Sequence, residues 1–471
     1  MSKRLLIMAA ILLLSVPAFA AVENIKVSGD INEQYVARDL SLGGTVHNQA
    51  DVESFLLSQV RLRFDADLTE NVSGVIRLID ERTWGEEDGF GDNTDVALDL
   101  AYIELKEFLY QPLSITVGRQ NLRYGSALIV GDPDTNMTVG TTSITNNRFG
   151  DLSLRKSFDA VKAVLDFSPW TIDAIYSKVR QPYTTSLLTD GTHIHNNVDL
   201  WGVNANYQWA SHDGVTEAYY FGMQNNRDSI AYTFVATQVP ENQDITHVVG
   251  ARTQFNPMEK LTLGLEGAYQ FGDIQTAAVS ANQARVLSAF AIEANAEYRF
   301  MTKYNPVIGL NYVYLSGNDD AGPNGDSHLT GWDPMFEDQS IGEIMNILFP
   351  NSNVQGARVN GSIMPREDVT LGVSYSWLEL ANKLTETVMS DGTALYGTTY
   401  STPLGRYNAN VYDINNLEGY LGSEIDAFAT YDYTEDVQLK LTGAWFIPGD
   451  FFADTNDDVA YSVRGGVNLN F

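Results

Sequence analysis

The feature that most constrains the fold of this chain is a strict two-residue alternation of apolar and polar side chains. From Val459 to Phe471, the odd positions are apolar, aromatic or glycine, and the even positions from Ser462 to Asn470 are polar or glycine. A period of two places successive side chains on opposite faces of a β-strand. The C-terminus is therefore predicted to be a strand with one apolar face and one polar, water-facing face, called the wet face.

The same alternation recurs along the whole chain. Val60, Leu62 and Phe64, for example, alternate with Arg61 and Arg63. We expect eighteen such strands, an even number that is typical of single-chain bacterial barrels. Their predicted starts are near Asn24, Val52, Val72, Val96, Pro112, Phe158, Trp170, Val198, Val215, Ile245, Leu261, Leu287, Pro306, Val354, Val369, Tyr420, Val437 and Val459.

The lengths of the connections alternate as well. Short links such as 69–71, 256–259 and 434–436 carry Pro, Asn, Asp or Gly, which set turn dihedrals. Short turns on one side and long loops on the other are typical of a transmembrane antiparallel β-barrel, with periplasmic turns and extracellular loops. A soluble propeller would show a blade repeat, and we find none. The long polar connections are 121–150, 181–197, 226–244, 316–352 and 381–419.

The N-terminus has the organisation of a secretory signal peptide. Lys3 and Arg4 precede an apolar run over residues 5–16, and Ala18-Phe19-Ala20 fits the small-x-small cleavage rule. The apolar run is too short to span a bilayer of about 30 Å. We therefore expect residues 1–20 to be a signal peptide and residues 21–471 to form a single barrel domain.

Composition excludes several other classes of protein. The 471 residues contain no Cys, 60 acidic and 29 basic residues, with a formal net charge of −31. The lack of Cys excludes disulfide scaffolds and Cys-ligated metal centres, and the acidic balance argues against a nucleic-acid partner. The six His residues are scattered, and neither a Gly-x-Ser-x-Gly elbow nor a His-Glu-x-x-His zinc motif occurs. We expect no enzymatic activity and no cofactor.

Aromatic residues lie near the ends of the predicted strands. In a membrane barrel such residues form girdles at the two interfaces, although ordinary cross-strand pairing would place them similarly. The residues concerned are Tyr35, Trp84, Tyr110, Trp170, Trp209, Tyr298, Tyr304, Trp377, Tyr431 and Tyr433.

Five short motifs, in order along the chain, resemble the alginate export family of outer-membrane porins. They are Val117–Gly125, Ser157–Val161, Tyr314–Asp319 together with Trp332–Phe336, Leu421–Asp426 and Ala444–Phe451. The resemblance implies an eighteen-stranded barrel that passes a polyuronate through a cationic pore.

With the apolar face of each strand turned outward, the wet face brings charged residues into the lumen. This projection places ten basic and eleven acidic residues there, so the wall is nearly balanced and departs from a strongly cationic conduit. For each residue the alternative is an ion pair that stiffens the wall without selecting solutes. We expect Arg61, Arg63 and Arg119 above all to line the pore, together with Arg77, Arg252, Arg299, Arg358, Arg464, Glu424 and Asp426.

Much of the acidic excess lies in the long connections. Asp454, Asp457 and Asp458 are weak candidates for a Ca²⁺ site, because carboxylates suit this ion, but their spacing is not that of an EF-hand. A solvated acidic rim is the simpler expectation. The connection 126–150, with turn chemistry at 131–134, is a candidate to fold into the barrel as a constriction.

These patterns favour a passive outer-membrane channel for hydrophilic or anionic solutes, an acidic polysaccharide such as alginate among them. The expected partners are outer-membrane lipid, lipopolysaccharide and the barrel-assembly machinery, which would engage the terminal strand ending at Phe471. The alternative is a surface structural or adhesion protein with a plugged barrel and acidic binding loops. The sequence leaves the solute, the transport direction and the oligomeric state open.

Overall fold

The structure is a computed structural model of the 471-residue chain. It describes residues 24–40, 42, 53–85, 96–133, 150–180, 197–227, 242–275, 284–318, 328–349, 351–383, 418–452, 454 and 457–471. The predicted signal peptide and most residues of the long connections lie outside this described part of the chain.

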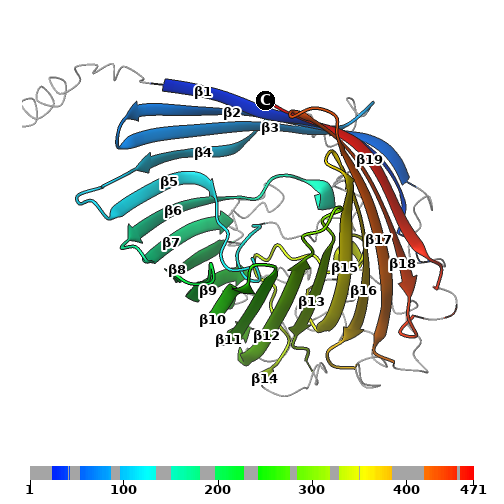
Figure 1. The fold of residues 1–471 in the computed structure, drawn as a ribbon. Coiled ribbons are helices and arrows are strands. Elements are labelled where there is room, and N and C mark those ends of the chain that lie inside the picture. Colours follow the sequence, from blue (N-terminus) through cyan, green and yellow to red (C-terminus); the bar gives the residue numbers. More distant parts are fainter. Residues whose placement is uncertain are drawn as a thin grey trace, which may run out of the picture.

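Strands dominate the described residues (Figure 1). The first ten are β1 (Asn24–Asp39), β2 (Glu53–Thr69), β3 (Val72–Thr83), β4 (Ala97–Leu105), β5 (Leu113–Asn121), β6 (Ser157–Asp166), β7 (Trp170–Arg180), β8 (Val198–Gln208), β9 (Val215–Arg227) and β10 (Asn242–Met258). The others are β11 (Leu261–Gln275), β12 (Ala284–Arg299), β13 (Val307–Leu315), β14 (His328–Leu329), β15 (Val354–Arg366), β16 (Val369–Leu380), β17 (Tyr420–Asp432), β18 (Val437–Pro448) and β19 (Ala460–Asn470).

The strands close into one antiparallel barrel. Each pairs with its neighbours along the chain, and β1 also pairs with β19, for example Asp30 with Asn470. The two-residue β14 pairs in parallel with β12 and is not part of the ring, which therefore has 18 strands. The predicted fold class is confirmed. Every predicted start lies within three residues of an observed one, the largest offsets being at Ile245 and Leu287.

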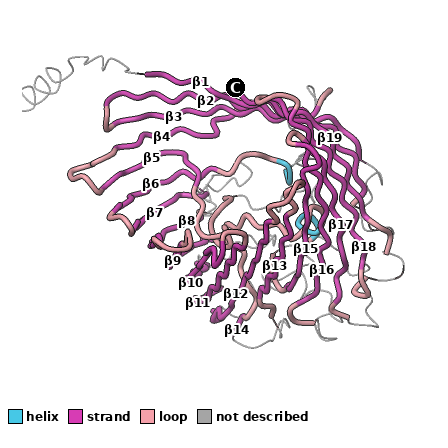
Figure 2. The backbone as a smooth tube through the Cα atoms, in the orientation of Figure 1, coloured by secondary structure: helices cyan, strands magenta, loops and turns pink. Residues whose placement is uncertain are grey.

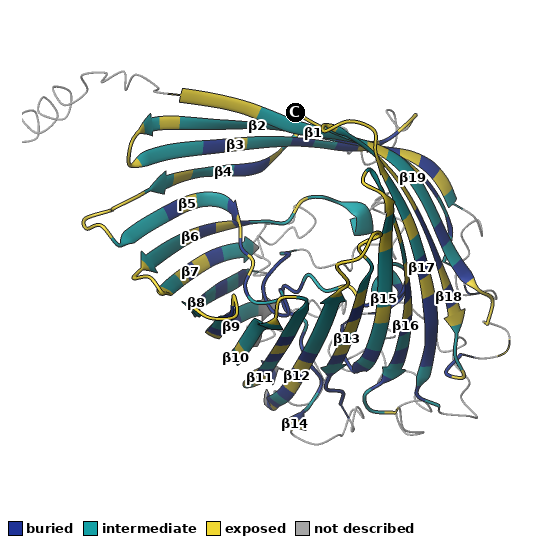
Figure 3. Ribbon diagram, viewed as in Figure 1, coloured by how far each residue is buried: buried dark blue, intermediate teal, exposed yellow. Residues whose placement is uncertain are grey.

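The two faces of the wall differ in the way that the alternation predicts. Large apolar side chains such as Ile25, Ile103 and Leu441 are more than half exposed, which is the reverse of a soluble protein. Exposed and buried residues alternate along many strands (Figure 3). An apolar outer face in contact with lipid accounts for this arrangement.

Helical structure is minor among the described residues (Figure 2). It comprises a 3₁₀ turn, η1 (Gly150–Leu152), and a single helical turn, α2 (Met345–Leu348). In this part of the chain, no helix is both long and apolar enough to cross a membrane.

Below, "turn end" denotes the rim with the short connections and "loop end" the rim with the long ones. A cluster of buried hydrophobic residues lies inside the barrel towards the loop end and joins the wall to segments 122–133 and 328–349. The loop-end half of the barrel is therefore partly filled, as the structure describes it.

Candidate functional site

The inner wall beside the β1–β19 closure is built from amides and basic side chains. On β2, Val60 and Leu62 take the outer positions, so Gln59 and Arg61 face the lumen. On β19, Val463 and Val467 are outside, and Arg464, Asn468 and Asn470 are therefore inside. The closure of the ring brings these residues together although they are about 400 positions apart in sequence, as the pairing of Asp30 with both Arg61 and Asn470 illustrates.

A lumenal cavity of about 490 Å³, here called the turn-end chamber, lies against this part of the wall. Its basic residues are Arg61, Lys156, Lys440 and Arg464, and its acidic residues are Asp30 and Asp151. The balance is therefore positive by two charges, in contrast to the chain as a whole. Its amides are Asn32, Gln34, Gln59, Gln438, Asn468 and Asn470.

A second cavity of about 210 Å³, the loop-end chamber, continues the path towards the loops. Its walls come from β1, β19 and the segment 338–347. Asp151, Leu152, Lys156 and Arg464 line both chambers and so mark their junction. The two chambers are therefore adjacent along the closure of the barrel, and the pair is called the polar route.

Two inward segments, 122–133 and 328–349, fill the lumen beside this route. Their backbones are hydrogen-bonded to each other. The Gly131 N–H donates to the Phe336 carbonyl at 2.7 Å, and the Phe336 N–H donates to the Ile129 carbonyl at 3.1 Å. Leu128 and Trp332 are almost fully buried in the apolar cluster. The connection after residue 126, which we expected to fold inward, does so over its described residues, 126–133. Residues 134–149 lie outside the described part of the chain.

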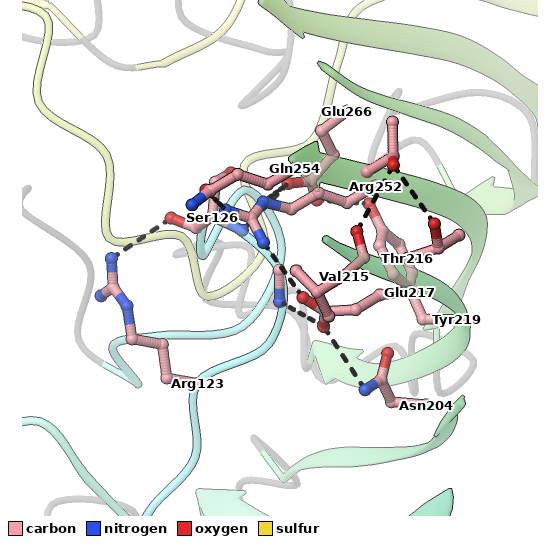
Figure 4. A network of polar contacts seen from close by, with 12 residues as sticks. Arg123, Ser126, Asn204, Val215, Thr216, Glu217, Tyr219, Arg252, Gln254 and Glu266 are labelled. Carbon is pink, nitrogen blue, oxygen red and sulfur yellow. Dashed lines mark hydrogen bonds and ion pairs between the residues drawn. The ribbon is translucent and has the colours of Figure 1, made fainter. Parts of the chain in front are cut away.

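The wall opposite the closure carries buried carboxylates that hold the first inward segment (Figure 4). Glu217 on β9 accepts the Gly125 N–H at 3.2 Å, and Glu266 on β11 accepts the Ser126 N–H at 2.9 Å. The Ser126 hydroxyl donates to Glu293 on β12 at 2.7 Å. Gly125 has φ +61°, which glycine adopts without strain, and a Cβ there would lie 2.7 Å from the Glu266 carboxylate, so glycine favours this close approach. The acidic wall is thereby covered.

A third segment, 150–156, is pinned inside the barrel next to the closure. The Gln59 amide donates to the Leu152 carbonyl at 2.8 Å, and Glu81 accepts the Leu154 N–H at 2.8 Å. Arg38 and Asp151 form a 2.9 Å ion pair whose side chains are 2 % and 4 % exposed. These contacts fix Lys156 at the junction of the two chambers.

Two adjacent acids of the second inward segment have pKa values shifted in opposite directions. Burial raises the pKa of Glu337 to about 7. Asp338 binds both Lys156 and Arg123, and these two cations hold its pKa below the usual value although burial opposes the effect. Burial and the neighbouring Asp173 carboxylate, which accepts the Tyr124 hydroxyl at 3.2 Å, raise the pKa of Tyr124. The inward segments are thus held by ion pairs and hydrogen bonds as well as by apolar packing.

Most of the predicted pore-lining residues lie on the inner face and are paired there. Arg61 binds Asp30 at 2.9 Å, Arg77 binds Asp99 at 2.5 Å, and Arg358 binds Asp426 at 3.4 Å. Arg63 binds Asp65 at 2.7 Å, and Arg252 binds Glu217 at 3.1 Å and Glu266 at 3.7 Å. Arg299 binds Glu297 at 2.7 Å near the turn end and is 70 % exposed. Of this predicted set, the structure brings only Arg61 and Arg464 to the chambers.

Arg119 is a correction, because its side chain lies on the outer face. The ladders align it with Ala101 and Asp159, on the same face as the exposed Val117 and Val161. The adjacent positions Gln120 and Phe158 are buried inside. Arg119 binds Asp159 through two hydrogen bonds of 2.9 and 3.0 Å. An outward charge is tolerated here because its partner neutralises it.

Two further predictions concern Glu424, which we expected to line the pore, and the three Asp residues considered as a Ca²⁺ site. Glu424 is fully buried and accepts the Ile344 and Met345 N–H groups at 2.8 and 2.7 Å, so it anchors the second inward segment. Asp454, Asp457 and Asp458 lie in the described residues, and no group of three or more His, Cys, Asp or Glu there is arranged to hold a metal ion.

Sequence reasoning missed Lys156, Asp338 and Glu343, because all three lie outside the strands. Their sequence signal is weak, since charged loop residues are ordinary. The amides of the chamber were visible as the wet face of the last strand, where Asn468 and Asn470 alternate with Val467 and Leu469.

Comparison with known families identifies the chain. The model of the alginate export family matches residues 24–465, nearly the whole sequence. The chain therefore belongs to the alginate export family. No curated protein matches it significantly.

The fold is similar to that of solved outer-membrane porins. OpdQ of Pseudomonas aeruginosa is 13 % identical, with a TM-score of 0.52 over 96 % of this chain and 98 % of that one. OccAB4 of Acinetobacter baumannii is 10 % identical, with a TM-score of 0.52 over 96 % and 99 %. OccK2 (OpdF) of P. aeruginosa, solved in complex with glucuronate, is 9 % identical, with a TM-score of 0.51 over 96 % and 99 %. The chain is an outer-membrane β-barrel channel of the Gram-negative type.

Proposed function

We propose that this channel passes hydroxylated carboxylates, uronates and short oligouronates above all, along the polar route at the β1–β19 closure. The observation that carries the proposal is the lining of the turn-end chamber, which combines four basic side chains with six amides. Basic residues attract a carboxylate, and amides both donate to and accept from sugar hydroxyls. The opposite acidic wall does not repel such a solute strongly, because the first inward segment covers it.

Two comparisons support the same chemistry. The family is named for export of a polyuronate, and one structural neighbour was solved with glucuronate. The chamber of about 490 Å³ has room for a monosaccharide or a short oligomer. Passage is the whole activity in this proposal, with no catalytic step and no cofactor.

The proposal includes the cellular context. Residues 1–20 act as a signal peptide, and residues 21–471 form the barrel. The outer face contacts lipid and lipopolysaccharide, and the barrel-assembly machinery engages the last strand, which ends at Phe471.

The proposal is tested by ion conductance in planar bilayers. The purified barrel should conduct chloride, and glucuronate should reduce that current at a lower concentration than glucose does. Equal effects of glucuronate and glucose would contradict the proposed selectivity.

One observation favours a second candidate, a plugged surface protein, because inward segments fill much of the loop-end lumen. This candidate predicts a barrel that does not conduct and an attachment activity in the loops. Deletion of residues 384–417 separates the two, because a channel should still conduct without them.

A further inference from the structure

The two basic residues at the junction of the chambers are each bound by a carboxylate of the second inward segment. Lys156 binds Asp338, and Arg464 binds Glu343. Both carboxylates therefore occupy positions that the carboxylate of a passing solute needs. They come from residues 338–343, only five positions apart in sequence.

The two pairs differ in how firmly the carboxylate is held. Asp338 binds Arg123 as well as Lys156, and its side chain is 18 % exposed. Glu343 forms an ion pair only with Arg464 among the described residues, and its side chain is 38 % exposed. Since a partly exposed single ion pair contributes little free energy, Glu343 is the carboxylate that exchanges easily.

The backbone on both sides of Glu343 is fixed. The Ser376 hydroxyl donates to the Ile341 carbonyl at 2.7 Å, and Glu424 accepts the N–H groups of Ile344 and Met345. The Glu343 side chain can consequently leave Arg464 while the segment itself remains in place.

We propose that Glu343 is an internal competitor that occupies Arg464 in the empty channel and is displaced by the carboxylate of a solute. This inference rests on the proposed function and adds a specificity-determining residue to it. A carboxylate replaces a carboxylate, so the guanidinium keeps a charge-assisted partner throughout the exchange. A neutral sugar offers no such replacement and leaves Glu343 bound.

The neighbouring strand provides the next basic residue for a solute carboxylate that leaves Arg464. On the neighbouring strand, Thr442 pairs with Arg464 and Lys440 pairs with Gly466, so Lys440 is one inward position closer to the turn end. Lys440 is exposed and forms no ion pair with any described residue. A solute carboxylate released from Arg464 by the return of Glu343 therefore has a basic group ahead of it.

The test uses Glu343→Gln in the full-length barrel, with Glu435→Gln as the matched control. Glu435 is exposed in the turn between β17 and β18, so the control removes the same charge away from the route. In planar bilayers, glucuronate added on the loop side is titrated against chloride current. The half-blocking concentration should fall about two- to fivefold in Glu343→Gln, the range expected for loss of one partly exposed ion pair. Glucose titrations should be unchanged.

An equal half-blocking concentration in Glu343→Gln and Glu435→Gln would overturn the inference, while a wild-type preference for glucuronate over glucose would leave the proposed function standing. If wild type shows no such preference, the proposed function fails and the inference fails with it. Should Glu343→Gln not assemble, Glu343→Ser makes the same measurement with a smaller side chain.

Discussion

At the scale of single residues, the face on which a charged side chain lies depends on its strand neighbours and not on its charge. Arg119 follows Ile115 and Val117 in period two, which places it on the outer face with them. The expectation that Arg119 lines the pore therefore conflicts with the alternation of its own strand. The pattern alone would have placed Arg119 outside, but only the structure shows that Asp159 neutralises it there.

The placement of Arg119 is tested by comparison with Arg61. Arg61→Gln leaves Asp30 unpaired in the turn-end chamber, so the reversal potential in a salt gradient should shift towards cation selectivity. Arg119→Gln should leave it at the wild-type value, because its side chain faces away from the ions. A shift for Arg119→Gln as large as that for Arg61→Gln would show that Arg119 contacts the pore.

The outer ion pair should also show strong coupling in stability. Arg119→Met or Asp159→Leu alone leaves one uncompensated charge facing lipid, which should lower the free energy of unfolding by about 1–3 kcal/mol. The double variant should return to within about 1 kcal/mol of wild type, since no charge remains. Urea unfolding in lipid vesicles measures all four proteins, and additive losses would contradict the lipid-facing pair.

At the scale of elements, the strands could be predicted from sequence, and the turn chemistry at 131–134 led us to expect that one connection folds inward. The partners that hold the inward segments could not be predicted. Each strand carries its own alternation, so a window of about ten residues contains the signal. The first inward segment depends on partners far away in sequence, such as Glu217 and Glu266 for Gly125 and Ser126. Nothing local marks those carboxylates as different from other polar residues on the wet face. The two chambers could not be predicted from the sequence either, because these segments form part of their walls.

The second inward segment should be held more firmly at acidic pH. The pKa of Glu337 is about 7, above the ordinary value of 4.5, so the folded segment binds the Glu337 proton more tightly than the released segment does. This stabilisation is complete below about pH 4.5 and is lost as the pH rises through 7. Asp338, with its lowered pKa, stays ionised throughout this window.

Hydrogen exchange measures this effect. Protection factors of amides in 328–349 should be higher at pH 5 than at pH 8, after correction for intrinsic exchange. Glu337→Gln should remove the difference, and Glu435→Gln should keep it. Equal protection of the wild-type segment at both pH values would contradict the assignment.

At the scale of the whole molecule, the net charge of −31 says little about the route that a solute takes. The acidic wall formed by Glu217, Glu266 and Glu293 is covered by an inward segment, and the open chamber lies across the barrel, where basic residues exceed acidic ones. Closure of the ring creates this difference, because it brings Arg464 from the last strand and Arg61 from the second strand into the lining of one chamber. A nearly balanced wall can therefore contain a cationic route.

The claim that solutes follow a cationic route is tested most directly by the reversal potential of the wild-type channel. It is measured in a potassium chloride gradient across a planar bilayer. The cationic route predicts a water-filled conductance with preference for chloride over potassium, and a smaller preference in Lys440→Gln and Arg464→Gln. A channel that prefers potassium, in spite of the basic residues of the turn-end chamber, would contradict the claim that ions and solutes follow this route.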